Sequence, residues 1–271
     1  MKIHASIVDY RKAEKVIPTL AALLAQETDD SLQVTVLDNS NSRKNFDILL
    51  GACCTAPNLT LVRSKQNTGY TKATNNSVDS SADFIVLLNP DVILDDPQTL
   101  KKAMAILREH PRIGIVGIRQ INPDGSAEAV ARRFPDLRAQ LGRRLGPLAK
   151  AIYKRRIDSY EYGDLASDAA GHVEVDWVQS SFWVVRGDLW RGLNGLDERF
   201  FLFMAEADFS WRANQAGYRT AIMLDTHARA DGLRASGGGL LAVFRSRALR
   251  SHIKDAVKYY LKNRSVDSAG H

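Results

Sequence analysis

Short apolar runs alternate with helical patterns along residues 3–118, and this alternation constrains the fold more than any other feature of the chain. The clearest run, Phe84–Leu88 (FIVLL), predicts a buried strand that ends at Asn89-Pro90-Asp91. We predict further strands at residues 3–8, 34–37, 59–62 and 113–118, and helices at 16–24, 71–80 and 97–110. Strands and helices in alternation favour an α/β fold with a Rossmann-type, mostly parallel sheet and helices on both faces.

A parallel sheet of this kind binds ligands at the carboxyl ends of its strands. Asp38, which follows the second strand, can accept from a nucleobase or a ribose hydroxyl, or it can form an ordinary Asx turn. Tyr10, after the first strand, can stack on a base or pack in the core. In Asn89-Pro90-Asp91, the carboxylate can bind a divalent cation that also holds a diphosphate, or the tripeptide can be a turn.

A polar loop, Asn67-Thr68-Gly69-Tyr70, precedes the helix predicted at 71–80. It matches neither the GxGxxG nor the Walker pattern. The backbone near Gly69 can approach a phosphate or a sugar, and the alternative is a plain turn before a helix.

In the second half of the chain, the regular alternation of strands and helices is interrupted by a basic stretch. Residues 132–156 are rich in Arg and Lys and predict an irregular or helical excursion. Residues 175–185 predict one strand, residues 188–193 a short helix, and residues 206–216 a helix that Gly217 ends.

Two carboxylates, Glu206 and Asp208, begin that last helix in an apolar setting. Because positions i and i+2 do not share a helix face, we expect different roles for them. One can be a general base and the other can cap the helix, or both can act as caps. His227 follows a strand-like run and can contact a metal or phosphate, or be structural.

A basic amphipathic segment covers Leu240–Asn263, after three glycines. It can lie on an anionic membrane surface or pack on its own domain with a solvated basic face. The net charge of +6 likewise predicts attraction to anions. No stretch approaches about 18 consecutive apolar residues, which is the length that spans a bilayer. We therefore expect a cytoplasmic protein, with Cys53 and Cys54 reduced.

The order of these motifs resembles the family 2 glycosyltransferases with the GT-A fold, and more narrowly the bacterial rhamnosyltransferases that extend lipid-linked polysaccharide. The resemblance runs from about residue 3 to residue 263. It is carried by these residues: Tyr10, Asp38-Asn39-Ser40, Asn67-x-Gly69-Tyr70, Asn75, Leu88-Asn89-Pro90-Asp91, Val175-Asp176-Trp177 and the stretch from Gly195 to Leu202.

The resemblance implies an inverting transfer from a nucleoside-diphosphate sugar, with dTDP-rhamnose as the preferred donor. The acceptor would be a lipid-diphosphate-linked saccharide in the synthesis of a cell-surface polysaccharide such as O-antigen. Tyr10 and Asp38 would hold the base, and Asp91 would hold Mg²⁺ or Mn²⁺, with His227 as a second contact. The other residues implied in donor binding are Asn39, Gly69, Asn75 and Asn89.

Two departures from the family pattern bear on the chemistry. The family has Glu-Asp-x-Asp where this chain has Ala205-Glu206-Ala207-Asp208, so Glu206 becomes the expected base. Trp177 and Asp208 would border the acceptor or the sugar, although Asp208 also suits a structural or capping role. Asn89 replaces the first acid of the Asp-x-Asp-like motif, which leaves a thinner metal site.

We expect a glycosyltransferase domain at 1–235, with a nucleotide-binding half at about 1–120 and an acceptor-binding half at about 121–235, followed by the basic helical region 236–271. The chain would work peripherally on the inner face of the cytoplasmic membrane. The alternative is a catalytically lapsed relative, or a basic protein that binds nucleotides, nucleic acid or membrane. No recognisable nucleic-acid module is present, and the missing glycine fingerprint disfavours an NAD-dependent enzyme.

Overall fold

The computed structural model describes residues 1–54, 56–134, 171–230, 251 and 254–262. Within them, ten strands form one sheet in the order β3-β2-β1-β4-β11-β6-β12-β5, with β7 beside β6 and β9 beside β12. The strands of this sheet are β1 (Lys2–Asp9), β2 (Ser31–Asp38), β3 (Leu59–Arg63), β4 (Phe84–Leu88), β5 (Val92–Leu94), β6 (Ile113–Ile121), β7 (Ala127–Glu128), β9 (His172–Val175), β11 (Phe182–Arg186) and β12 (Arg219–Ala230). A separate pair joins β8 (Ala131–Arg132) to β10 (Trp177–Val178).

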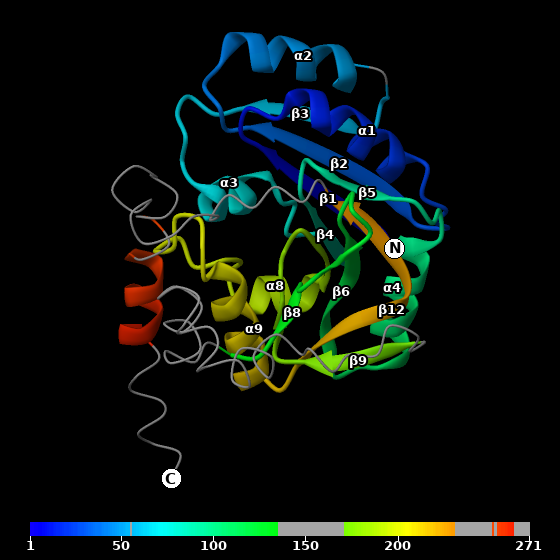
Figure 1. Ribbon diagram of the computed structural model, residues 1–271, viewed down its shortest axis with the longest axis vertical. Helices are drawn as coiled ribbons and strands as arrows, with labels where there is room; N and C mark the ends of the chain where they lie inside the picture. The colour runs from blue at the N-terminus through cyan, green and yellow to red at the C-terminus, as the bar shows by residue number, and fades with distance from the viewer. Residues whose placement is uncertain (55, 135–170, 231–250, 252–253, 263–271) are drawn as a thin grey trace.

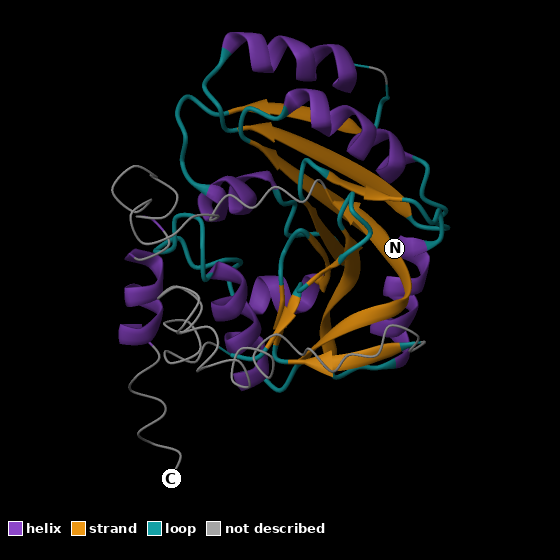
Figure 2. Ribbon diagram, in the orientation of Figure 1, coloured by secondary structure: helices purple, strands orange, loops and turns teal. Residues whose placement is uncertain are grey.

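Helices lie on both faces of the sheet, as the alternating pattern predicts (Figures 1 and 2). Their bounds are α1 (Ala13–Leu24), α2 (Arg43–Cys53), α3 (Tyr70–Ser77), α4 (Thr99–Glu109), α8 (Gly187–Gly192) and α9 (Ala205–Gln215). Residues 254–262 form one more helix, which we call the C-terminal helix. It lies beside the loop that leads into α9 (Figure 1).

Two cores hold the helices to the sheet. The first joins α1, α2 and α4 to one face, where Val16, Leu20 and Leu23 of α1 are buried as their helical spacing predicts. The second joins α8 and α9 to the other face through Trp183 and Phe209, whose ring centroids are 5.7 Å apart. Each face of the sheet is therefore covered by its own group of helices.

The sheet is parallel where the sequence predicts nucleotide binding. β1 pairs in parallel with both β2 and β4, and β2 pairs in parallel with β3. In the second half, β6 and β12 are parallel to each other, while β11 runs antiparallel between β4 and β6. The mixed α/β architecture is thus confirmed, and the ends of β1, β2 and β4 meet at one edge.

The strand predicted at residues 175–185 is wrong as a single element. Val175 pairs with β12, Trp177 pairs with β8, and Phe182 pairs with β4, so the chain changes partner twice over this stretch. Hydrophobic content alone cannot reveal such a change, because every piece is apolar.

The helix α2 and the short strands β5, β7, β8 and β9 escape the sequence prediction. The start of α2 does carry a signal, since the side chain of Ser42 accepts a hydrogen bond from the backbone N–H of Asn45 as an N-cap. Most of the excursion predicted at 132–156 lies outside the described residues. So does most of the region 236–271, apart from residue 251 and the C-terminal helix. Cys53 and Cys54 are both free, as expected.

The described helices are all too short or too polar to cross a bilayer. This finding agrees with the absence of a long apolar run in the sequence.

The glycines offer a test of this packing. A Cβ at Gly187, where β11 turns into α8, would lie 1.9 Å from the carbonyl oxygen of Ala82, whose backbone cannot move away cheaply. We expect Gly187→Ala to lower the free energy of unfolding by about 1–3 kcal/mol, measured by urea denaturation. Gly51→Ala in α2 is the matched control, because a Cβ there meets nothing within 4 Å. It should raise stability by about 0.5–1 kcal/mol, and equal effects of the two substitutions would refute the packing described here.

Candidate active site

Two buried carboxylates lie side by side at the ends of β1 and β2. Asp9 pairs with Asp38 in the parallel register, and both are 0% exposed. The side-chain amide of Asn45 donates to Asp9 Oδ2 at 2.5 Å and to Asp38 Oδ1 at 3.0 Å. One amide from α2 thus bridges two acids that would otherwise repel each other.

The two acids are not equally satisfied. Burial raises the pKa of Asp9, and the neighbouring Asp38 adds to this effect. Asp38 Oδ1 also accepts from the backbone N–H of Ser40, whereas its Oδ2 is buried and has no hydrogen-bond partner among the described residues. An unpartnered buried carboxylate oxygen is costly, so it marks a place where a ligand N–H or O–H would be held.

Tyr10 lies next to this pair, at the surface. The residue is 48% exposed, and the guanidinium of Arg11 is 5.6 Å from the centroid of its ring. Arg11 has a φ of +61°, a conformation that is uncommon for a side chain of this size and turns the chain sharply after β1. The arrangement leaves an aromatic face available for stacking.

The side chain of Asn39 bonds to the loop 67–69 and does not face solvent. It is 2% exposed, and its amide nitrogen donates to Asn67 Oδ1 and to the carbonyl of Gly69, each at 3.1 Å. Its amide oxygen accepts from the backbone N–H of Thr68 at 3.0 Å and from the Thr68 hydroxyl at 3.2 Å. The amide of Asn39 is therefore fully engaged in shaping this loop.

Gly69 lies where this loop meets the segment before α9. Its φ is +84°, and a Cβ would lie 2.5 Å from the carbonyl oxygen of Phe201. The next residue, Tyr70, donates its backbone N–H to that same carbonyl at 2.7 Å. Only glycine allows this close approach of two backbones.

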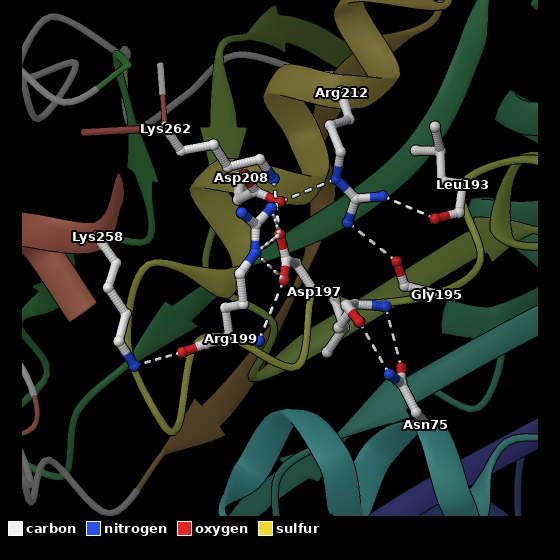
Figure 3. Close-up of polar contacts among 10 residues, drawn as sticks. Asn75, Leu193, Gly195, Asp197, Arg199, Asp208, Arg212, Lys258 and Lys262 are labelled. Carbon is white, nitrogen blue, oxygen red and sulfur yellow. Dashed lines mark hydrogen bonds and ion pairs between the residues drawn. The ribbon is translucent and has the colours of Figure 1, made fainter. Parts of the chain in front are cut away.

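Asn75 has an equivalent holding role on α3. Its amide oxygen accepts from the N–H of Leu196 at 2.9 Å, and its nitrogen donates to the carbonyl of Leu196 at 2.8 Å (Figure 3). The same nitrogen reaches Glu198 at 3.3 Å. Asn75 thus fastens the nucleotide half of the sheet to the loop that approaches α9.

The metal residues expected from the sequence are not all brought together. Asp91 forms an ion pair with the ammonium group of Lys12, which follows β1. Ala228 pairs with Leu94 and Ala230 with Val92, so His227 lies at the far end of β5 from Asp91. That separation is about 13 Å along the strand.

The Asp91 carboxylate already pairs with one positive charge, the Lys12 ammonium, so a divalent cation would have to compete with that ammonium. In the same turn, the backbone N–H of Asn89 donates to the carbonyl of Ser181 at 2.9 Å. No group of three or more His, Cys, Asp or Glu side chains gathers within the described residues, so Mg²⁺ or Mn²⁺ would take its remaining ligands from phosphate and water.

Glu206, the expected base, lies in the first turn of α9 and points toward the sheet edge. Its Oε1 accepts from Ser180 at 3.1 Å, and Ser180 also contacts the hydroxyl of Tyr70 at 2.8 Å. Ser180 is adjacent to Ser181, which bonds the backbone of Asn89. Burial raises the pKa of Glu206, and the charge of Arg132 opposes this.

Asp208 and Trp177 are both buried, at 0% and 6% exposure. Asp208 Oδ2 accepts from Arg212 at 2.8 Å, and its Oδ1 accepts from Lys262 at 2.5 Å (Figure 3). Trp177 donates its indole N–H to the carbonyl of Arg133 at 2.7 Å and packs against the segment before Glu206. Both residues support the surroundings of Glu206 in this structure.

Sequence reasoning missed several residues that shape the site. Asn45 carries no motif, although the N-cap pattern after Ser42 could have located it. Lys12 and Lys262 look like ordinary surface charges in the sequence. Their roles depend on partners that are 79 and 54 residues away.

Comparisons with known proteins agree with this geometry. Residues 7–171 match the family described as "Glycosyl transferase family 2". Over 216 residues, the chain is 26% identical to N-acetylglucosaminyl-diphospho-decaprenol L-rhamnosyltransferase of Mycobacterium tuberculosis, a match covering 73% of this chain and 66% of that protein.

Two solved structures have the same fold. The mannosyltransferase PcManGT from Pyrobaculum calidifontis, in complex with GDP-Man and Mn²⁺, is 16% identical with a TM-score of 0.59, covering 94% of this chain and 64% of that one. Residues 1–349 of S. aureus TarS are 16% identical with a TM-score of 0.56, covering 85% and 60%. The chain thus spans just under two thirds of the rhamnosyltransferase and of PcManGT, and 37% of the longer TarS chain.

The ion pair between Lys12 and Asp91 generates a prediction about cations. Because the ammonium competes for the carboxylate, we expect Lys12→Met to bind Mn²⁺ more tightly than the wild-type protein, by about tenfold if about 1.4 kcal/mol of competition is removed. Isothermal titration with Mn²⁺ alone measures this. Lys72→Met, on the exposed face of α3, is the control. Unchanged or weaker binding in Lys12→Met would show that the ammonium does not compete.

Proposed function

The chain belongs to glycosyl transferase family 2, and from this premise we propose that it transfers a sugar from a nucleoside-diphosphate donor to an acceptor hydroxyl with inversion at the anomeric carbon. The observation that carries the proposal is the position of Glu206, which Ser180 joins to the strand edge bearing Asn89 and Asp91. A base and a cation-binding acid that share one edge are what an in-line displacement needs.

In this mechanism, each group has one task. Asp38 receives the N–H of the base through its unpartnered Oδ2, and Tyr10 stacks on the base. Glu206 takes the proton of the acceptor hydroxyl as that oxygen forms its bond to the anomeric carbon. As this bond forms, the bond between the anomeric carbon and the diphosphate breaks on the opposite face, and Lys12 lies beside Asp91 where the negative charge of the leaving diphosphate accumulates. A divalent cation at Asp91, when bound, would neutralise the same charge.

Relatives suggest the substrates. The match to a protein named N-acetylglucosaminyl-diphospho-decaprenol L-rhamnosyltransferase supports L-rhamnose as the sugar and a lipid-diphosphate-linked saccharide as the acceptor. TarS has been solved with UDP and with UDP-GlcNAc, and PcManGT with GDP-Man, which supports a nucleotide-sugar donor in general. We propose dTDP-rhamnose as the donor.

A lipid-linked acceptor calls for a place on the membrane. The C-terminal helix exposes Val257 at 52% and Leu261 at 68%, with the exposed Lys254 on the same face. Apolar and basic side chains together suit an anionic bilayer surface. We propose that this face docks on the cytoplasmic leaflet.

The experiment that tests the function is a donor screen. Purified protein is incubated with dTDP-rhamnose, UDP-GlcNAc or GDP-mannose and a lipid-diphosphate-linked N-acetylglucosamine, and nucleotide release and product mass are followed. Release that needs both dTDP-rhamnose and the acceptor supports the proposal. Nucleotide binding without transfer from any donor would indicate a catalytically lapsed relative.

For the base, we expect Glu206→Gln to lower kcat about 10²–10⁴-fold, because the amide cannot take the proton. Burial raises the pKa of Glu206, and the base must be deprotonated, so activity should fall on the acid side with a midpoint above the ordinary value of about 4.3. The groups that face Glu206 are Ser180, Tyr70 and Arg132. Glu109→Gln, at the end of α4, is the control, and full activity of Glu206→Gln would exclude Glu206 as the base.

For the membrane face, we expect Val257→Asp combined with Leu261→Asp to reduce co-sedimentation with vesicles containing phosphatidylglycerol. The substitutions place negative charge on an exposed apolar surface and should leave folding intact, because both side chains already face water. Leu50→Asp, an exposed apolar residue on α2, is the matched control. Equal sedimentation of all three proteins would remove this helix face from the docking surface.

A further inference from the structure

The segment between Gly195 and α9 is irregular, so its backbone N–H groups need partners from elsewhere. Three consecutive groups point at one side chain, Asp255 of the C-terminal helix. Phe201 donates at 3.2 Å, Leu202 at 3.0 Å and Phe203 at 3.1 Å. Asp255 is 1% exposed. Successive N–H groups that converge on a buried carboxylate form strong, charge-assisted hydrogen bonds.

A second residue of the same helix holds the two ends of this segment. Lys262 lies seven positions after Asp255, on the same helix face. Its ammonium donates to Asp197 Oδ2 at 2.8 Å and to Asp208 Oδ1 at 2.5 Å (Figure 3). Hydrogen bonds from Arg199 and Lys262 keep the pKa of Asp197 below its usual range, although burial acts to raise it. Asp197 therefore stays charged and paired.

The segment held in this way makes two contacts with the site. At Phe201, its carbonyl accepts from Tyr70 and its ring lies against Gly69, in the loop beside Asn39. Three residues beyond Phe203, the same chain delivers Glu206 to Ser180. The C-terminal helix thus contacts Asp208 directly through Lys262, and it reaches Glu206 and the Gly69 loop through the backbone of Phe201–Phe203.

We propose that Asp255 is a positioning residue of the transferase, which sets the place of Glu206 and of the Gly69 loop by holding the backbone of Phe201–Phe203. The C-terminal helix therefore completes the active site in addition to covering the core. The inference rests on the proposed function in one respect, the role of Glu206 as base. The alternative is a contact that contributes stability alone.

The decisive variant is Asp255→Asn, which keeps the side-chain volume but removes the charge and one acceptor oxygen. We expect kcat to fall by about tenfold to a hundredfold, because small displacements of a reacting group have effects of this size, while KM for the donor changes less. The acid limb of the pH profile should move to lower pH as water reaches Glu206, which Tyr70, Ser180 and Arg132 face in the intact site.

Asp30→Asn is the matched control. Asp30 is also a largely buried, doubly paired carboxylate, bonded to the N-terminal amine and to Arg108 at the opposite end of the strands. It should lose stability but keep its kcat and pH profile. If Asp255→Asn behaves like Asp30→Asn in both respects, the contact is structural only and the proposal is overturned.

Hydrogen exchange separates this inference from the proposed function. In folded Asp255→Asn, the amides of Phe201–Phe203 and of Tyr70 should exchange at least about tenfold faster, as expected when about 1.4 kcal/mol of protection is lost. In Asp30→Asn they should not. A wild-type protein that transfers no sugar would refute the function while leaving this measurement valid. Unchanged exchange at both places would refute the positioning role even in an active enzyme.

Lys262→Met provides a second route if Asp255→Asn does not fold. This substitution leaves Asp255 intact and removes the ion pairs that join the C-terminal helix to Asp197 and Asp208. Arg212 still neutralises Asp208. We expect the same fall in kcat and the same faster exchange at Phe201–Phe203. Wild-type values of both in Lys262→Met would overturn the proposal.

Discussion

The parallel pairing of β1 with β2 and β4 is the constraint on which the site depends. It sets Asp9 beside Asp38 and brings Asn89 to the same edge. Two neighbouring buried acids are unfavourable. The amide of Asn45 offsets part of this cost, while burial and the charge of Asp38 still raise the pKa of Asp9. One carboxylate oxygen of Asp38 has no partner among the described residues, so unfavourable electrostatics gather at the edge where we propose that the donor base binds.

The remainder of the site consists of loops, and polar side chains hold these loops by their backbones. Asn39 shapes residues 67–69, Asn75 fixes Leu196, and Asp255 holds Phe201–Phe203. A loop without such partners would leave buried N–H and C=O groups unsatisfied. Amide and acid residues in this family pattern can thus act on the chain's own backbone, and proximity to a motif does not by itself make them ligand contacts.

Local physics explains which features the sequence predicted. Apolar runs and helical spacing located β1, β4 and α1, and strand ends located Asp38 and Asp91, because each signal lies within a few residues. The division of residues 175–185 among three partners could not be read from the sequence, since each piece is equally apolar. Lys12, Asp255 and Lys262 were missed for another reason. Their structural roles depend on partners 53 to 79 positions away in the chain. A single charged residue in the sequence does not indicate which distant residue it will pair with.

The contact between Asp255 and Phe201 also has a consequence for the order of assembly. Asn75 meets Leu196 across 121 positions, and Asp255 meets Leu202 across 53. During synthesis, β1 to β4 can pair early, but the segment before α9 gains its carboxylate only after the C-terminal helix has left the ribosome. A nascent chain can therefore hold Asp9, Asp38 and Asn89 together at one edge while Glu206, the proposed base, still lacks its final position.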